Sequence, residues 1–219
     1  MKINERRKLD EILVDGFSAG TITDIFGFRG SGKTQLALQS SLNLLKTGNT
    51  VLFIDTTSEF RPERFLEIVK NRNLDISLLS KLQIARVTNT KEQIDLIQKI
   101  KKNDDSIMML IVDNVTDLFS FEYSKKEQFN RQQHKFMNYM HELSQLAIQK
   151  KIPIVITNQL MKANNIEYEK MDKSISNYTH QKIKLEKQRG HYQGTILSPF
   201  SQKTQFFYKI EKMGLVEAS

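Results

Sequence analysis

The chain contains no cysteine and no long apolar run. The absence of cysteine from its 219 residues excludes a disulfide scaffold and a thiolate metal site. No stretch approaches the about 18 consecutive apolar residues of a membrane-spanning helix, and no apolar segment of a signal peptide follows the charged start at residues 1–7. The four histidines show no metal-ligand spacing with carboxylates. These absences predict a protein without a membrane partner that is not secreted, located in the cytoplasm or associated with the nucleus or nucleoid.

The chain has more basic than acidic residues. A formal net charge of +8 and a pI near 9.5 favour an anionic partner, of which nucleic acid is the first candidate. Solvated lysine-rich helix faces would give the same numbers, so both interpretations stay open. Hydrophobic residues make up 39% of the chain, which is enough for a core, and the length suits one α/β domain over residues 1–219.

Residues 27–34 fit the pattern G-x-x-x-x-G-K-[ST] of a phosphate-binding loop. Glycines let the backbone fold tightly, so that its N–H groups point at phosphate oxygens. We expect Lys33 to contact the β- and γ-phosphates of ATP and to act in catalysis, and the Thr34 hydroxyl to ligate Mg²⁺. The nucleotide-binding candidates around this loop are Gly27, Phe28, Arg29, Gly30, Ser31, Gly32, Lys33, Thr34 and Gln35.

Apolar runs alternate with amphipathic segments along most of the chain. This order predicts βαβ units and a mainly parallel central sheet flanked by helices. The expected strands are 21–26, 50–55, 82–87, 107–113 and 152–157; the expected helices cover 5–13, 36–45, 90–101 and 129–147, and another begins at 61–64.

The last third of the chain has a different pattern. Residues 160–177 are polar and loop-like, and three extended segments near 181–186, 191–197 and 204–210 predict antiparallel hairpins at one edge of the sheet. Lys182 and its neighbouring basic residues alternate with apolar ones, which is typical of the solvated face of an edge hairpin.

Two strand ends supply further polar candidates. Asp113 ends an apolar run and has the Walker B pattern, in which a buried strand delivers a carboxylate to the Mg²⁺ shell. Gln159 ends the next expected strand, where it can contact a γ-phosphate or its attacking water. In a parallel sheet these ends share the edge at which ligands bind.

The chain resembles the RecA/RadA recombinase family over nearly its whole length, and most closely the archaeal RadB-type paralogue, which lacks an N-terminal DNA-binding domain. The resemblance implies a RecA-like P-loop NTPase core. It also implies that Arg64 stacks on adenine, that Gln159 senses the γ-phosphate, and that residues 119–130 and 160–177 are mobile DNA-binding loops. The segments that carry the resemblance are 9–13, 27–34, 55–64, 110–113, 131–133, 157–159, 178–179, 184–187 and 210–215.

Basic residues in the two expected loops are candidates for contact with single-stranded DNA. Their cations would neutralise phosphates, and neighbouring aromatic rings such as Phe121 and Tyr168 would stack on bases. The alternative is that these are solvated loop charges with the aromatic rings in the core. The basic candidates are Lys125, Lys126, Arg131, Lys162, Lys170 and Lys173.

Three departures from the family pattern affect function. Thr57 stands where the family has the glutamate that polarises the attacking water, and a hydroxyl is no general base near neutral pH. Glu59 is the nearest substitute, but only after a shift of its loop. Residues 171–174 replace the usual Gly-Gly, and no Phe-x-x-Ala polymerisation tag precedes the core; Phe17 begins a turn instead.

These observations lead to three functional hypotheses. The first is an ATP-binding recombinase paralogue that binds DNA and assists or regulates a full recombinase, with weak hydrolysis and possible homo- or hetero-oligomers. The second is a competent DNA-dependent ATPase or strand-exchange protein, in which Glu59 or a neighbouring subunit supplies the carboxylate. The third is a KaiC-like signalling ATPase without a DNA role.

Overall fold

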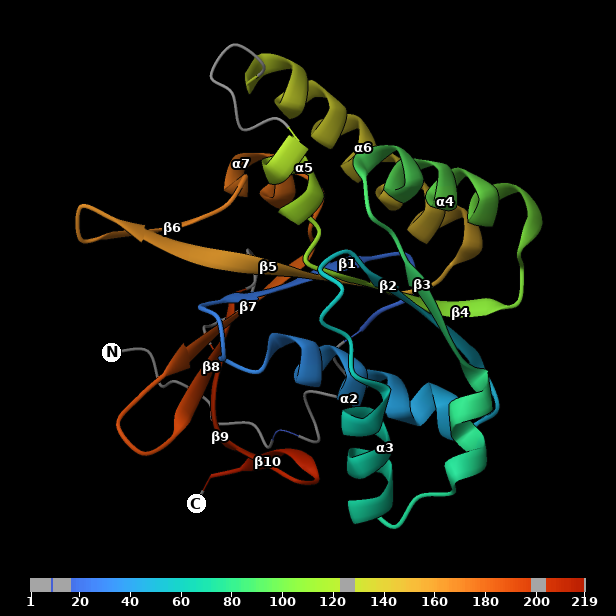
Figure 1. Cartoon of the computed structure of the whole chain (residues 1–219), viewed down its shortest axis with the longest axis vertical. Coiled ribbons are helices and arrows are strands. Elements are labelled where there is room, and N and C mark those ends of the chain that lie inside the picture. Colours follow the sequence, from blue (N-terminus) through green and yellow to red (C-terminus); the bar gives the residue numbers. More distant parts are fainter. Residues whose placement is uncertain (1–8, 10–16, 123–128, 198–203, 219) are drawn as a thin grey trace.

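The computed structural model describes residues 9, 17–122, 129–197 and 204–218. Its centre is one mixed sheet with helices on both faces (Figure 1). The sheet has the order β10-β9-β8-β7-β1-β5-β4-β2-β3, and β6 pairs with β5 beside this path. The strands are β1 (Ile22–Gly27), β2 (Thr50–Asp55), β3 (Leu82–Arg86), β4 (Ile107–Asp113), β5 (Ile154–Ala163), β6 (Ile166–Glu169), β7 (Gln181–Lys187), β8 (Tyr192–Leu197), β9 (Thr204–Glu211) and β10 (Gly214–Glu217). The helices are α2 (Lys33–Lys46), α3 (Pro62–Asn71), the 3-10 helix η1 (Ile76–Lys81), α4 (Thr90–Asn103), α5 (Asp117–Glu122), α6 (Phe129–Lys150) and α7 (Asp172–Ser176).

The pairing confirms a mainly parallel centre with antiparallel C-terminal strands. β1 lies between β5 and β7 and is parallel to both, and β4, β2 and β3 continue the parallel part. β7 to β10 then pair as successive antiparallel neighbours. Strands β7 to β10 therefore extend the same sheet beyond β1 instead of forming a separate unit.

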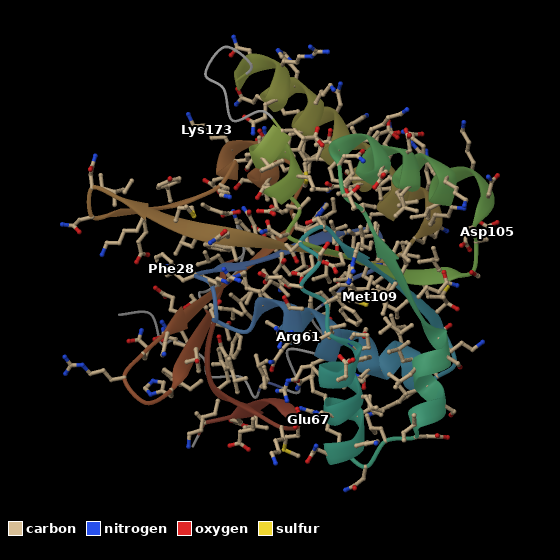
Figure 2. All side chains as sticks on the ribbon, viewed as in Figure 1. Phe28, Arg61, Glu67, Asp105, Met109 and Lys173 are labelled. Carbon is tan, nitrogen blue, oxygen red and sulfur yellow. The ribbon has the colours of Figure 1, made fainter. Side chains whose placement is uncertain are left out.

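Helices cover both faces, which explains the continuous apolar run of β4. α2 and α3 pack on one face, and α4, α5, α6 and α7 on the other (Figure 1). Successive β4 residues alternate between the two cores: Met109 packs on the α2 side and Leu110 on the α6 side. Met109 lies in the interior, whereas Asp105 lies at the periphery (Figure 2).

The expectation of a polar loop over 160–177 is wrong. β5 continues to Ala163, turns back through Asn164 and Asn165 into β6, and is followed by α7. Both asparagines have a positive φ, 48° and 62°, which suits the tight turn of a hairpin. The burial pattern of β6 is the inverse of the usual one, because Ile166 and Tyr168 are exposed and Glu169 is buried.

Two other expectations need correction. β7 is an interior strand, so Lys182 does not lie on a solvated edge hairpin. Within 119–130, residues up to Glu122 belong to α5 and α6 begins at Phe129, while 123–128 lie outside the described residues. The helix expected over 5–13 also lies outside them except for Leu9, which is buried. Within the described ranges, no helix is long and apolar enough to cross a membrane.

Candidate nucleotide-binding site

The loop between β1 and α2 depends on two glycines for different reasons. A Cβ on Gly27 would lie 2.3 Å from the carbonyl oxygen of Leu185, so only glycine lets β1 approach β7 this closely. Gly32 caps α2 with a φ of 91°, a conformation that residues with a side chain rarely adopt. The two glycines therefore let the loop backbone pass from β1 into the N-terminus of α2, and helix N-termini are sites at which anions bind.

The Lys33 ammonium folds back over this loop. Nζ donates to the carbonyl oxygens of Gly27 and Phe28, at 3.0 and 2.9 Å. Burial lowers the pKa of Lys33 to about 8, although the charges of Asp113 and Glu59 act in the opposite direction. A partly desolvated ammonium whose hydrogen bonds go to neutral carbonyls would gain strongly from a phosphate oxygen, and this fits a nucleoside triphosphate.

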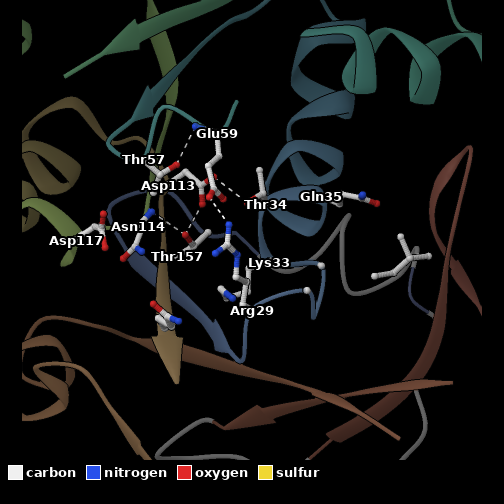
Figure 3. Close-up of a pocket in the computed structure, with 14 residues that line it drawn as sticks. Arg29, Lys33, Thr34, Gln35, Thr57, Glu59, Asp113, Asn114, Asp117 and Thr157 are labelled. Atoms are coloured by element: carbon white, nitrogen blue, oxygen red, sulfur yellow. Dashed lines mark hydrogen bonds and ion pairs between the residues drawn. The ribbon is translucent and has the colours of Figure 1, made fainter. Parts of the chain in front are cut away.

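Asp113 forms the centre of a cluster of hydroxyl groups (Figure 3). Thr34 Oγ1 donates to Oδ2 at 2.8 Å, and Thr157 Oγ1 donates to Oδ1 at 2.5 Å. Burial raises the pKa of Asp113, and the hydrogen bonds from Thr157 and Thr34 oppose this shift. Carboxylate and hydroxyl oxygens side by side at the end of a buried strand are a donor set that fits Mg²⁺.

The segment after β2 differs from what a catalytic carboxylate requires. The backbone N–H and the hydroxyl of Thr57 both donate to Asp55 Oδ1, each at 3.1 Å. Glu59 forms an exposed ion pair with Arg29, and the N–H of Glu59 donates to Thr57 Oγ1 at 3.2 Å. Thr57 is therefore held by Asp55. Glu59 is paired with Arg29 (Figure 3).

These groups line a cavity of about 450 Å³. It collects side chains from the P-loop, from the ends of β2, β4 and β5, and from β9, which is the edge at which a parallel sheet binds ligands. Gln159 lines it as expected, whereas Gly27, Phe28, Ser31 and Arg64 are not among the lining residues. The lining consists of Arg29, Gly30, Gly32, Lys33, Thr34, Gln35, Thr57, Glu59, Asp113, Asn114, Asp117, Thr157, Gln159 and Ile210.

Arg64 does not line this cavity, but it contacts Gln35, which does. Its guanidinium donates to Gln35 Oε1 at 3.1 Å and to the carbonyl oxygen of Lys212 at 3.2 Å, and it also contacts Glu211 O and Glu67. Gln35 lines the cavity and Arg64 holds its side chain. Stacking of Arg64 on adenine stays a prediction.

The C-terminal strands contribute contacts that the sequence did not reveal. Tyr208 on β9 donates to the Ser31 carbonyl oxygen at 2.6 Å, and Ile210 lines the cavity. Gln39 of α2 exchanges two hydrogen bonds with the backbone of Leu215, both 2.9 Å. These residues are more than 170 positions from the loop that they support, so no local pattern connects them. No sequence pattern indicated that Asp117, at the start of α5, would line the cavity.

The DNA-binding candidates lie on several elements. Arg131 on α6, Lys162 on β5 and Lys173 on α7 are exposed, and Lys170 is half-buried. Lys173 points outward (Figure 2), whereas the backbone N–H of Lys170 donates to Gln159 O at 3.3 Å, which connects that segment to the cavity. Lys125 and Lys126 lie outside the described residues. Among the aromatic rings, Phe119 is buried in the core, whereas Phe121 and Tyr168 are exposed.

The sheet order, the flanking helices and the β1–α2 loop define a RecA-like P-loop NTPase core. The chain belongs to the Rad51 family, because the model of that family matches residues 3–217. It is similar to the "DNA repair and recombination protein RadA" of Metallosphaera sedula, with 29% identity over 198 residues. This alignment covers 84% of the chain and 61% of the relative, so the chain spans less than two thirds of that protein. Membership of the RecA/RadA recombinases is thereby confirmed.

Proposed function

We propose that this chain is an ATP–Mg²⁺-binding recombinase paralogue that binds DNA and assists or regulates a full recombinase in recombination and repair, with weak hydrolysis. The observation that carries the proposal is the cavity that Lys33, Thr34 and Asp113 line together. Thr57, which has a hydroxyl and no carboxylate, lines the same cavity. Family membership and the similarity to RadA support the role in recombination and repair.

Each residue of the site would have a separate role in binding ATP and Mg²⁺. Lys33 would exchange its loop carbonyls for the β- and γ-phosphates, and Thr34 and Asp113 would hold Mg²⁺, which neutralises charge on those oxygens when bound. Thr57, held by Asp55, takes no proton from water near neutral pH. ATP would therefore act mainly as a conformational ligand.

Steady-state ATP hydrolysis, with and without single-stranded DNA, tests this role. We expect measurable ATP binding but negligible turnover, and a gain of about 10²–10⁴-fold in Thr57→Glu, the range typical of a restored general base. Thr57→Gln is the matched control, because it has the size of glutamate without a base. Rapid DNA-stimulated turnover in the unaltered chain, lost in Lys33→Ala, would contradict the proposal.

A competent ATPase is the second candidate, and one observation favours it. Besides Asp113, the carboxylates of Glu59 and Asp117 line the cavity within the described part of the chain. If the unaltered chain turns over rapidly, Glu59→Gln and Asp117→Asn identify which of them supplies the base. A fall in only one variant assigns the base to that residue, and a fall in neither assigns it to a neighbouring subunit.

DNA binding is tested by the anisotropy of labelled single-stranded DNA at several salt concentrations. Replacing the exposed Lys162 and Lys173 by alanine should weaken binding and reduce its salt dependence, since fewer counterions are released. The control replaces Lys46 and Lys70, which are also exposed but lie on α2 and α3. Equal losses in both pairs would indicate non-specific attraction, and no salt-dependent binding at all would favour a signalling ATPase.

A further inference from the structure

A buried group of charges lies beneath the β6–α7 segment, outside the nucleotide cavity. Its centre is Lys182 on β7, whose Nζ contacts Glu169 at the end of β6. Nζ also lies 2.7 Å from Asp172 Oδ1 on α7 and 3.4 Å from Asp24 Oδ2 on β1. One ammonium therefore connects four elements of the fold.

The charges in this group do not balance. Asp24 is fully buried, and neither of its carboxylate oxygens has a hydrogen-bond partner within the described residues. Glu169 is also buried, and the Lys182 side chain is only 16% exposed. Because three carboxylates surround one cation, ionising both Asp24 and Glu169 is costly. Burial and the nearby Glu169 raise the pKa of Asp24 well above its ordinary value, which disfavours its charged form.

Besides the pairing of β6 with β5, few buried side chains hold the β6–α7 segment. Glu169 is the only buried residue of β6, and α7 buries only Ser174 and Ile175. Between them Met171 has a φ of 55°, a conformation that a residue with a side chain adopts at a cost. The charges around Lys182 therefore add to the β5–β6 pairing in attaching this segment to the sheet.

A chain of hydrogen bonds joins this group to the nucleotide cavity. The Asn158 side chain donates to Glu169 Oε1 and to the Lys170 carbonyl oxygen, both at 2.8 Å. Its Oδ1 accepts from Thr116 Oγ1 at 2.8 Å, in the turn that follows Asp113. Asn158 is fully buried, and its neighbour Thr157 donates to Asp113, so the same strand end touches both sites.

We propose that Lys182 with Asp24, Glu169 and Asp172 forms a latch that holds the β6–α7 segment on the sheet, and that Asn158 makes opening of this latch depend on the nucleotide cavity. The second half rests on the proposed function, since it requires ATP as the ligand; the latch itself does not. The latch controls Lys170 and Lys173, two of the basic residues proposed to contact DNA.

Hydrogen–deuterium exchange of residues 164–177 tests the latch without nucleotide. Lys182→Met keeps an apolar stem and removes the ammonium, and amides in this segment should exchange at least about 10-fold faster. Lys101→Met is the matched control, because Lys101 is 18% exposed and joins α4 to α6 through Glu142 at 2.9 Å. Exchange of 164–177 should be unchanged in this control. The same exchange rate in both variants overturns the latch.

A second variant decides the question if Lys182→Met does not fold. The Asp172 side chain is 54% exposed, so Asp172→Asn removes one ion pair without disturbing the core. We expect a smaller increase in exchange, confined to the same residues. An increase spread over the whole sheet, or none, overturns the latch.

The coupling is tested by the same exchange measurement with ATP and Mg²⁺ added. In the unaltered chain, the nucleotide should make residues 164–177 exchange faster. Thr116→Val removes the hydroxyl bonded to Asn158 and should reduce this response, while Thr116→Ser restores it. Calorimetry should show the same ATP affinity in all three proteins. A full response in Thr116→Val overturns the coupling. Absence of ATP binding refutes the proposed function and the coupling with it, whereas the latch is decided by the first experiment.

Discussion

Asp113 and Asp24 are two buried aspartates on parallel strands of one sheet, and their surroundings differ. Asp113 receives hydroxyl hydrogen bonds at 2.8 and 2.5 Å and borders an open cavity. Asp24 receives no hydrogen bond within the described residues and is paired at 3.4 Å with the Lys182 ammonium. Burial raises the pKa of both carboxyl groups.

The difference shows that burial alone does not make a carboxylate a ligand site. The hydroxyls around Asp113 favour its charged form and leave room for a cation, so this carboxylate is prepared for Mg²⁺. Asp24 is fully buried between a lysine and a second carboxylate, and its charged form is disfavoured, so it is not prepared to bind a cation. We therefore expect substitutions at the two positions to affect different properties.

The largest effect should come from Asp113→Asn. Removing this charge should weaken Mg²⁺-dependent ATP binding by at least about 10–100-fold, the range seen when groups that support a metal are altered. Asp24→Asn is the matched control and should leave ATP affinity unchanged. Calorimetric titration of both variants with ATP, with and without Mg²⁺, checks this. Equal losses at the two positions would refute the distinction.

Thr157→Val tests the hydroxyl that holds Asp113. The variant keeps the side-chain shape but leaves Asp113 Oδ1 and the Asn114 N–H without their partner, since Thr157 Oγ1 donates to the first and accepts from the second at 2.9 Å. Loss of such buried hydrogen bonds should cost about 1–3 kcal/mol of unfolding free energy. Urea unfolding measures it. Thr157→Ser should recover most of the loss; if it is as unstable as the valine variant, lost packing is the cause.

The pH dependence of stability should distinguish Asp24. The pKa of Asp24 is higher in the folded than in the unfolded chain. Its contribution to the free energy of unfolding is therefore complete below about pH 4 and declines as the pH rises toward the folded pKa. The charged groups that face it are Lys182 and Glu169, and Lys182 in turn pairs with Asp172. Directly before β7, His180 Nδ1 accepts from the Ile22 N–H at 3.4 Å.

Asp24→Asn cannot ionise, so its stability relative to the unaltered chain should improve with rising pH, by at most about 1.4 kcal/mol per pH unit. Urea unfolding of both proteins between pH 5 and 8 measures the difference. Parallel curves would show that Asp24 does not titrate in this range.

The smallest effect is expected at the mouth of the cavity. Arg29 and Glu59 are 80% and 63% exposed, so breaking their ion pair by Arg29→Ala should change the unfolding free energy by less than about 0.5 kcal/mol. Arg29→Lys is the control that retains a cation. A larger loss in thermal unfolding would mean that this pair orders the loop between β2 and α3.

Part of the site was predictable because its signals are local. Residues 27–34 are one contiguous pattern, and Asp113 ends an apolar run that is visible without any partner. The alternation of apolar runs with amphipathic helices along the chain also predicted the parallel centre. Helices on both faces make those strands apolar throughout. The same reasoning failed for 160–177, where the short strand β6 exposes Ile166 and Tyr168 and buries Glu169, and where two asparagines form the turn of the β5–β6 hairpin.

The sequence by itself determined the P-loop, the strand that carries Asp113 and the alternation of strands with helices in the parallel core, since each is encoded in neighbouring residues. Only the tertiary structure decided the partners of Lys182, which come from positions 24, 169 and 172, and the placement of Tyr208 against the P-loop. Side chains that meet across different strands and helices share no spacing in the chain. Their contacts exist only once the sheet has brought them together.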